Sequence, residues 1–215
     1  MKRSSSFNTV VILILVGLCA AAFSQQDGFV PLLKADSKGI YSKHGWNHYG
    51  PGHFTLDEKT GVLQGHGGMG LLWYSVKKFK DFVLELEYSV ELPKSNSGVF
   101  VRIPELVYDN SYVGKSFEIQ ICGTCIGIHK SAGVYDAVAP KEGVEQKGPG
   151  EWNLLRITCQ GERMKIELNN QQTVDWKITV PVGKIKETFS EGYIGLQNHD
   201  KDNSTFFRNI RIKEL

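Results

Sequence analysis

Apolar and polar residues alternate along several short segments of this chain. Phe82–Val90 and Phe117–Ile121 place apolar side chains at every second position, the period of a strand with one buried face. Trp152–Cys159 and Met164–Leu168 follow, joined by a short turn containing Gly161 that is typical of a hairpin. Four further ranges complete the expected set of strands: Val99–Ile103, Thr173–Trp176, Gly192–Gln197 and Phe206–Ile212.

This pattern predicts an all-β fold, an antiparallel two-sheet sandwich or jelly roll. After residue 24, no segment of ten or more residues carries an apolar stripe with the 3.6-residue period of a helix. We therefore expect under a tenth of residues 25–215 in helix. The 23 glycines fit a fold with many tight turns. Gly123–Gly150 is the longest stretch without a strand pattern, and loops of that length are usually functional. The residues expected in the core are Phe82, Leu84, Leu86, Phe117, Ile119, Leu168 and Ile194.

The N-terminus resembles a secretory signal peptide. Lys2 and Arg3 precede the apolar run Val10–Leu18, which is shorter than the roughly 20 residues that span a bilayer. Ala22-Phe23-Ser24 fits a small-x-small cleavage site, so residues 1–24 are predicted to be removed and 25–215 to form one secreted or periplasmic domain. An uncleaved anchor and a lipoprotein modified at Cys19 remain as alternatives.

Charge and cysteine content narrow the function classes. The mature chain would hold 23 basic and 23 acidic residues, because the leader carries two bases and no acid; nucleic-acid binding is not expected. Three cysteines would remain: Cys122, Cys125 and Cys159. The spacing of Cys122 and Cys125 favours a local disulfide or buried thiols over redox chemistry, since no helix start or second metal-ligand pair accompanies it.

Polar residues on strand faces are the candidate chemistry. Glu118 and Gln120 leave the same face of their strand, and Gln197 and His199 share a face if that strand continues. Directional carboxylate, amide and imidazole groups near aromatic rings suit sugar hydroxyls. The available aromatic residues are Tyr135, Trp46, Trp73 and Trp152. Plainer interpretations are a solvated Glu118, a structural salt bridge for Arg102, and packing roles for Trp152.

Seven short motifs occur in a characteristic order: Phe79–Phe82, Asn96–Arg102, Glu118–Ile121, Gly133–Tyr135, Glu151–Asn153, Gly195–Gln197 and Phe207–Ile210. With them the chain resembles the 3-keto-disaccharide hydrolase domain family over about Gly28 to Leu215. The resemblance implies a concanavalin-like sandwich that cleaves glycosides oxidised at C3. The chain departs from the family pattern at Cys122, where the family commonly has Asp.

On matching positions the resemblance implies a set of site residues. Those expected in catalysis are Glu118, His199 and Arg102, and those expected to bind substrate are Asn96, Ser97, Gln120, Tyr135 and Gln197. A C3 ketone acidifies the C2 hydrogen, so Glu118 or His199 could remove it while Arg102 or Gln120 stabilises the enolate. The sequence requires no cofactor and leaves a bound metal ion open.

Three function classes stay open at this point. The first is the keto-glycoside hydrolase or lyase, and the second is a lectin-like module that binds a carbohydrate without turnover. The third is an ordinary glycoside hydrolase, which needs two carboxyl groups roughly 5–5.5 Å apart when it retains configuration. The strand face of Glu118 carries one acid, so the loop residues Asp109 and Asp136 would be the acids to examine.

The leader gives the first testable prediction. Exported protein should be soluble and should begin at Gln25, because cleavage follows the small residue Ser24. N-terminal sequencing of the exported material measures this directly, and a lipid on Cys19 would contradict it.

Overall fold

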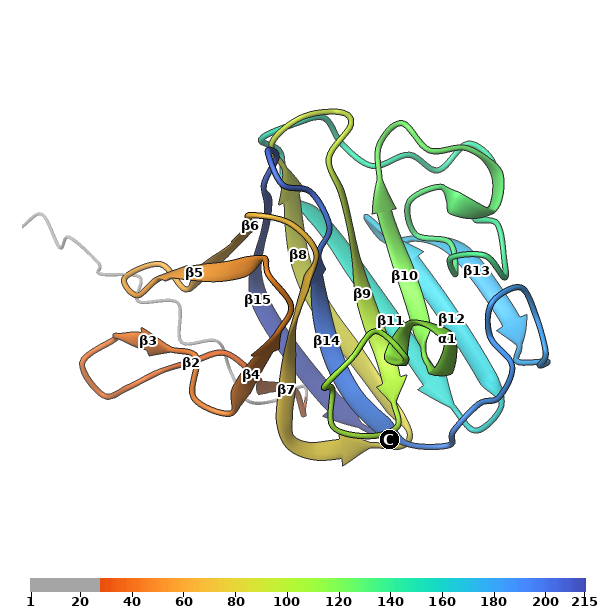
Figure 1. Cartoon of the computed structure of the whole chain (residues 1–215), viewed down its shortest axis with the longest axis horizontal. Coiled ribbons are helices and arrows are strands. Elements are labelled where there is room, and N and C mark those ends of the chain that lie inside the picture. The colour runs from red at the N-terminus through yellow and green to blue at the C-terminus, as the bar shows by residue number, and fades with distance from the viewer. Residues whose placement is uncertain (1–27) are drawn as a thin grey trace, which may run out of the picture.

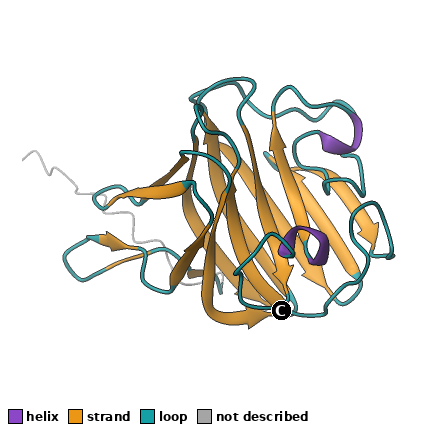
Figure 2. Ribbon diagram, viewed as in Figure 1, coloured by secondary structure: helices purple, strands orange, loops and turns teal. Residues whose placement is uncertain are grey.

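Two antiparallel sheets pack face to face in the computed structural model, which describes residues 28–215 (Figure 1). The expected leader, its cleavage site and Cys19 lie outside the described residues. Helix is confined to two short segments of the described chain, α1 (Tyr112–Lys115) and the 3-10 helix η2 (Gly127–His129) (Figure 2). The prediction of an all-β sandwich with little helix is confirmed.

The larger sheet has the strand order β13-β12-β11-β8-β15-β6-β5, with β1 paired to β15. The bounds of its strands are β13 (Gln171–Lys177), β12 (Arg163–Leu168), β11 (Asn153–Gln160), β8 (Phe82–Val90), β15 (Thr205–Glu214), β6 (Val62–His66), β5 (His53–Asp57) and β1 (Val30–Pro31). The predicted hairpin is the antiparallel pair of β11 and β12, in which Gln160 faces Arg163.

The smaller sheet has the order β10-β9-β14-β7-β4. Its strands are β10 (Phe117–Cys122), β9 (Asn96–Ile103), β14 (Gly192–Asn198), β7 (Gly70–Phe79) and β4 (Trp46–Tyr49). A separate two-stranded sheet consists of β2 (Lys34–Ala35) and β3 (Tyr41–Ser42). The smaller sheet is the one that positions the candidate site.

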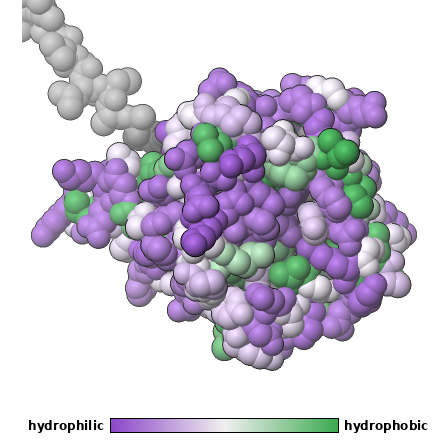
Figure 3. Space-filling model, turned by 45° about the horizontal axis from the view of Figure 1, so that its top comes forward, coloured by the Kyte–Doolittle hydropathy of each residue, from purple (hydrophilic) through white to green (hydrophobic). Residues whose placement is uncertain are grey.

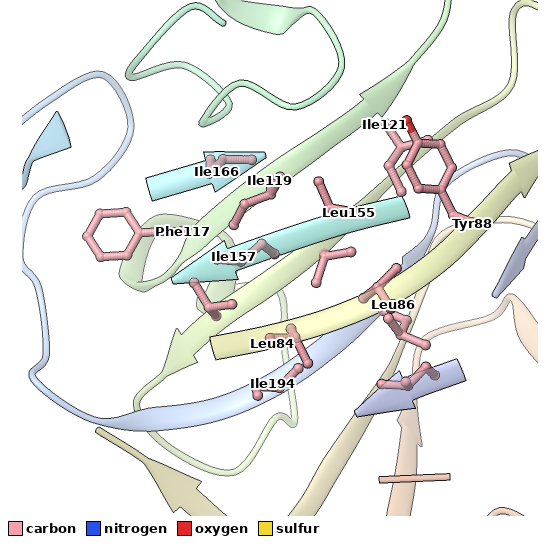
Figure 4. Packing of buried hydrophobic residues seen from close by; sticks show 14 of the residues in the cluster. Leu84, Leu86, Tyr88, Phe117, Ile119, Ile121, Leu155, Ile157, Ile166 and Ile194 are labelled. Carbon is pink, nitrogen blue, oxygen red and sulfur yellow. The ribbon is translucent and has the colours of Figure 1, made fainter. Parts of the chain in front are cut away.

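The main core lies between the two sheets. Ile119 of β10 and Ile194 of β14 pack toward Leu84 of β8 and Leu155 and Ile157 of β11, and all five are fully buried (Figure 4). Burying such a side chain contributes roughly 1.5–3 kcal/mol each. All seven residues predicted for the core are buried, with exposures of 0–1%: Phe82, Leu84, Leu86, Phe117, Ile119, Leu168 and Ile194.

The strands of residues 30–79 were not predicted. The longest of them, β7, places Leu72 in the main core and Leu71 and Trp73 in a second apolar cluster on the opposite face of the smaller sheet. A strand with apolar residues on both faces does not alternate. The other strands of this region have two to five residues, too few to show a period.

The segment 123–150 lies along the edge of the smaller sheet, although it contains no regular strand. The backbone N–H groups of Ala132 and Tyr135 donate to the carbonyl oxygens of Gln120 and Glu118, and Gln120 N–H donates back to Gly133. The segment thereby covers the free edge of β10 and holds Tyr135 beside Glu118.

Of the two structures expected for Cys122 and Cys125, a local disulfide or buried thiols, the structure has the disulfide. Cys122 and Cys125 form a disulfide, and Cys159 is a free, buried thiol whose pKa burial raises to about 12. Figure 3 shows a mainly hydrophilic face on which apolar residues form separate small patches. Within residues 28–215 no helix has the length and apolar character needed to cross a membrane.

The disulfide generates a prediction about stability. The double variant Cys122→Ser/Cys125→Ser should unfold with about 2 kcal/mol less free energy, because a cross-link across so short a loop restrains the unfolded chain only modestly. Urea denaturation measures the difference. A loss of 5 kcal/mol or more, on the order of the largest disulfide effects, would contradict this view.

Candidate functional site

The outer face of the smaller sheet carries two rows of paired residues. In one row Glu118 of β10 lies opposite Phe100 of β9, which lies opposite Gly195 of β14. In the next row Gln120 lies opposite Gly98, and Gly98 lies opposite Gln197. The alternation of the strands puts Phe117, Ile119 and Ile121 in the core, so the Glu and both Gln side chains leave on the other face.

Gly98 makes the space that the Glu118 side chain occupies. A Cβ atom at residue 98 would lie 2.7 Å from one carboxylate oxygen of Glu118 and 2.8 Å from its Cγ. Glu118 can therefore lie down over the strand, where only 4% of the residue is exposed. A glycine at this point of β9 is what allows a carboxylate to be buried on the sheet.

Lys184 is the charged partner of Glu118. Its ammonium nitrogen lies 3.0 Å from Oε2 of Glu118 and 4.0 Å from the centre of the Tyr135 ring. The Lys184 N–H donates to Oδ2 of Asp136 at 2.7 Å, which anchors the loop. Gly183 has φ +50° and a Cβ there would overlap the Asp136 carbonyl oxygen, so the lysine reaches the site because its neighbour has no side chain.

The environment of Glu118 acts on its pKa in both directions. Burial raises the pKa, because the charged form loses its hydration. The Lys184 ammonium opposes this shift, followed by the nearby His199 and by a hydrogen bond from the Gln197 amide. The net pKa lies above that of an ordinary glutamate, so Glu118 is a stronger base than a solvated carboxylate.

A chain of hydrogen bonds links Gln120 to His199. The Gln120 amide donates to the side-chain oxygen of Asn96 at 3.1 Å, and the Asn96 backbone N–H donates to Asp200 at 2.8 Å. Asp200 also contacts Nδ1 of His199 at 3.0 Å. The side chain of His199 is 43% exposed, so it lies at the rim of the site, whereas Gln120 lies at its base.

Two hydrogen-bond acceptors at the bottom of the site have no partner among the described residues. The side-chain oxygens of Gln120 and Gln197 are buried, and neither accepts a hydrogen bond within residues 28–215. Buried carbonyl oxygens are rarely left unpaired, because each lost hydrogen bond costs about 1–3 kcal/mol. Their natural partners are O–H groups, which a sugar presents.

The structure separates two expected residues from this cluster. Ser97 faces the interior of the sandwich, one position out of phase with Asn96, and its hydroxyl donates to the backbone oxygen of Gln197. Arg102 has φ +58° and is 2% exposed; its guanidinium donates to the Gly161 oxygen in the β11–β12 turn. The Arg102 side chain therefore ties one sheet to the other and is not brought together with Glu118, so its expected catalytic role stays a prediction.

Several residues of the site were not among the candidates. Lys184 and Asp200 lie in loops where no period indicates a direction, so the sequence offered no signal for either. Tyr112, which lies near Glu118, begins a helix of four residues, which is too short to show a period in the sequence. Within residues 28–215, His, Cys, Asp and Glu side chains form no group of three that could hold a metal ion.

The model of the 3-keto-alpha-glucoside-1,2-lyase-like domain matches residues 34–213. The chain belongs to this family. No curated protein sequence matches it.

Solved structures share the fold. A protein described as a candidate glycosyl hydrolase from Parabacteroides distasonis is 25% identical, with a TM-score of 0.68 over 87% of this chain and 99% of its own. The carbohydrate-binding module CBM66 of Bacillus subtilis is 17% identical, with a TM-score of 0.55 over 79% of this chain and 96% of its own. A Bacillus subtilis protein with a galectin-like fold is 11% identical, with a TM-score of 0.59 over 86% and 94%. The concanavalin-like expectation for the fold is thereby confirmed.

The position of Arg102 in this family member yields a prediction. Arg102→Met should lower the free energy of unfolding by about 1–3 kcal/mol, because the Gly161 oxygen loses a buried donor. If the parent turns over a 3-keto-glucoside, the rate of the folded variant should stay within a few-fold of it. Urea denaturation and steady-state kinetics give the two values. A loss of turnover without a loss of stability would show that Arg102 acts in the site.

Proposed function

We propose that this protein is an exported enzyme that cleaves 3-keto-glycosides by removing the C2 proton, eliminating the C1 substituent and adding water. The observation that carries the proposal is one buried carboxylate, Glu118, with a raised pKa beside a lysine and two unpaired amide oxygens. Membership of the 3-keto-alpha-glucoside-1,2-lyase-like family supports the substrate class.

Glu118 is the base in this proposal. The hydrogen at C2 is acidic because the C3 ketone delocalises the carbanion as an enolate. A carboxylate with a raised pKa is suited to remove this proton, a contribution of roughly 10²–10⁴-fold. The amide oxygens of Gln120 and Gln197 accept from sugar hydroxyls and hold C2 over the carboxylate.

Lys184 takes the role first expected of Arg102. Its ammonium is the cation in contact with Glu118, and it rests over the face of Tyr135. When a sugar enters, the ammonium moves from the carboxylate to the C3 oxygen. That exchange frees the base and places a positive charge where negative charge develops.

Hydrolysis by paired carboxylates has less support. Asp109 lies on an exposed loop and accepts hydrogen bonds from Ser111, which lower its pKa. Asp136 is engaged by the Lys184 backbone. A single base is sufficient for elimination from a keto-sugar, whereas a retaining glycosidase requires two carboxyl groups.

The predicted leader places the enzyme in the periplasm or outside the cell. The disulfide between Cys122 and Cys125 supports this compartment, since such bonds persist in oxidising environments. A carbohydrate is the only partner proposed.

A binding module without turnover is the second candidate. Cys122 stands where the resemblance leads us to expect Asp, and its sulfur is committed to the disulfide. It therefore cannot replace a carboxylate as an acid or base. If the missing Asp is essential, the site retains its sugar-binding groups and loses catalysis.

Glu118→Gln distinguishes the two candidates. The amide keeps the shape of the side chain but cannot take a proton, so turnover of a 3-keto-glucoside should fall by roughly 10²-fold or more with little change in affinity. In the parent, kcat/KM should decline as pH falls through a pKa above that of an ordinary glutamate, because protonation removes the base. The residual kcat/KM of the variant should show no such decline at low pH.

Glu214→Gln is the matched control. Glu214 is also paired with a lysine, Lys77, but its side chain is 59% exposed, far along β15. It should leave turnover unchanged. Binding of the keto-sugar by the parent without any turnover would favour the binding module.

A further inference from the structure

Tyr112 lies against the residues that surround Glu118. It begins α1, and its ring packs edge to face on Phe100 at 5.0 Å between centroids. Phe100 is the cross-strand neighbour of Glu118. The Ser116 hydroxyl donates to the Tyr112 carbonyl oxygen, which fixes the turn that carries the ring. The helix therefore delivers a phenol to the row of the sheet that holds the carboxylate.

The Tyr112 hydroxyl is buried and unpaired. The residue is 4% exposed, and its oxygen has no hydrogen-bond partner within residues 28–215. Buried tyrosine hydroxyls usually find a partner. On the same face of the sheet, Gln120 and Gln197 have unpaired side-chain oxygens and Trp73 has an unpaired indole N–H, so Tyr112 is one of several buried polar groups there that a ligand could pair.

The surroundings keep this phenol protonated. Burial raises the pKa of Tyr112, and the negative charge of Glu118 raises it further. A neutral phenol donates a proton and does not remove one. Glu118 and Tyr112 thus form a base and an acid whose environments hold them in complementary protonation states.

We propose that Tyr112 is the proton donor to the glycosidic oxygen of the substrate. This inference rests on the proposed function of Glu118 and assigns the second proton of the same reaction. It makes Tyr112 a catalytic residue that contacts the scissile bond from the side of α1.

The protons and electrons balance over the cycle. Glu118 takes the C2 proton, the C2–H electrons form the C1–C2 double bond, and the C1–O bond breaks as Tyr112 protonates the departing oxygen. Water then adds to C1 and gives a proton to the Tyr112 phenolate, while Glu118 returns its proton to C2. Both residues regain their starting state, and no oxidant or reductant is consumed.

The two groups assist one another electrostatically. Glu118 disfavours the phenolate of Tyr112 as long as the carboxylate is charged. Once Glu118 has accepted the C2 proton, that charge is gone and the phenol becomes more acidic. The donor is strongest at the moment when the leaving group needs a proton.

Tyr112→Phe tests the assignment with two substrates that share one 3-keto-glucosyl group. An alkyl leaving group departs poorly unless it is protonated, whereas 4-nitrophenolate departs unaided. We expect kcat/KM to fall by roughly 10²-fold or more on the alkyl glycoside and to stay within a few-fold on the nitrophenyl glycoside. Exchange of the C2 hydrogen in deuterated water should continue, because Glu118 is intact.

Tyr193→Phe is the control, since Tyr193 packs on Trp73 of the same face and should affect both substrates little and equally. Equal losses on both substrates, or no loss, in Tyr112→Phe would overturn the proton donor alone. A parent that neither exchanges C2 hydrogen nor cleaves either substrate would overturn the proposed function as well. If Tyr112→Phe fails to fold, a steep dependence of the parent's kcat/KM on leaving-group acidity would overturn the donor, and a shallow one would support it.

Discussion

A carboxylate buried on a sheet needs a counter-charge, and the site depends on the pair of Glu118 and Lys184 that meets this need. Removing a charge from water costs several kcal/mol, and a close ion pair with further hydrogen bonds offsets that cost. The pair joins β10 to a loop about 66 residues away in the chain. Asp136 and Tyr135 fix the lysine in turn, so the long segment 123–150 is a structural part of the site.

The sandwich fixes the direction of the strand side chains, and a loop supplies the counter-charge. Strands β10 and β14, with β9 between them, present Glu118, Gln120 and Gln197 on one face and pack Ile119 and Ile194 on the other. Rigid strands of this kind hold functional groups more precisely than loops do. The lysine and the phenol come from segments outside the two sheets, Lys184 from a loop and Tyr112 from α1, and both lie against this face.

Period-2 alternation predicted most of this arrangement. It placed the strands from Phe82 onward and the shared face of Glu118 and Gln120, because a half-buried strand shows its orientation in its sequence. The assignment of Arg102 to the site came from the family resemblance, and at that residue a left-handed φ turns the side chain inward, toward Gly161. Ser97 could have been assigned to the inner face by parity alone. Lys184 could not have been placed, since its position depends on a long-range contact with Asp136.

The loop that carries Lys184 has a consequence for how heat inactivates the protein. Ile185, the next residue, is fully buried in the main core, so the lysine is tied to the apolar packing of the sandwich as well as to Asp136 and Glu118. Segments anchored in a core open only at free energies close to that of the whole fold. Glu118 would then keep its counter-ion until the sheets come apart, so the site would fail at the temperature at which circular dichroism reports unfolding.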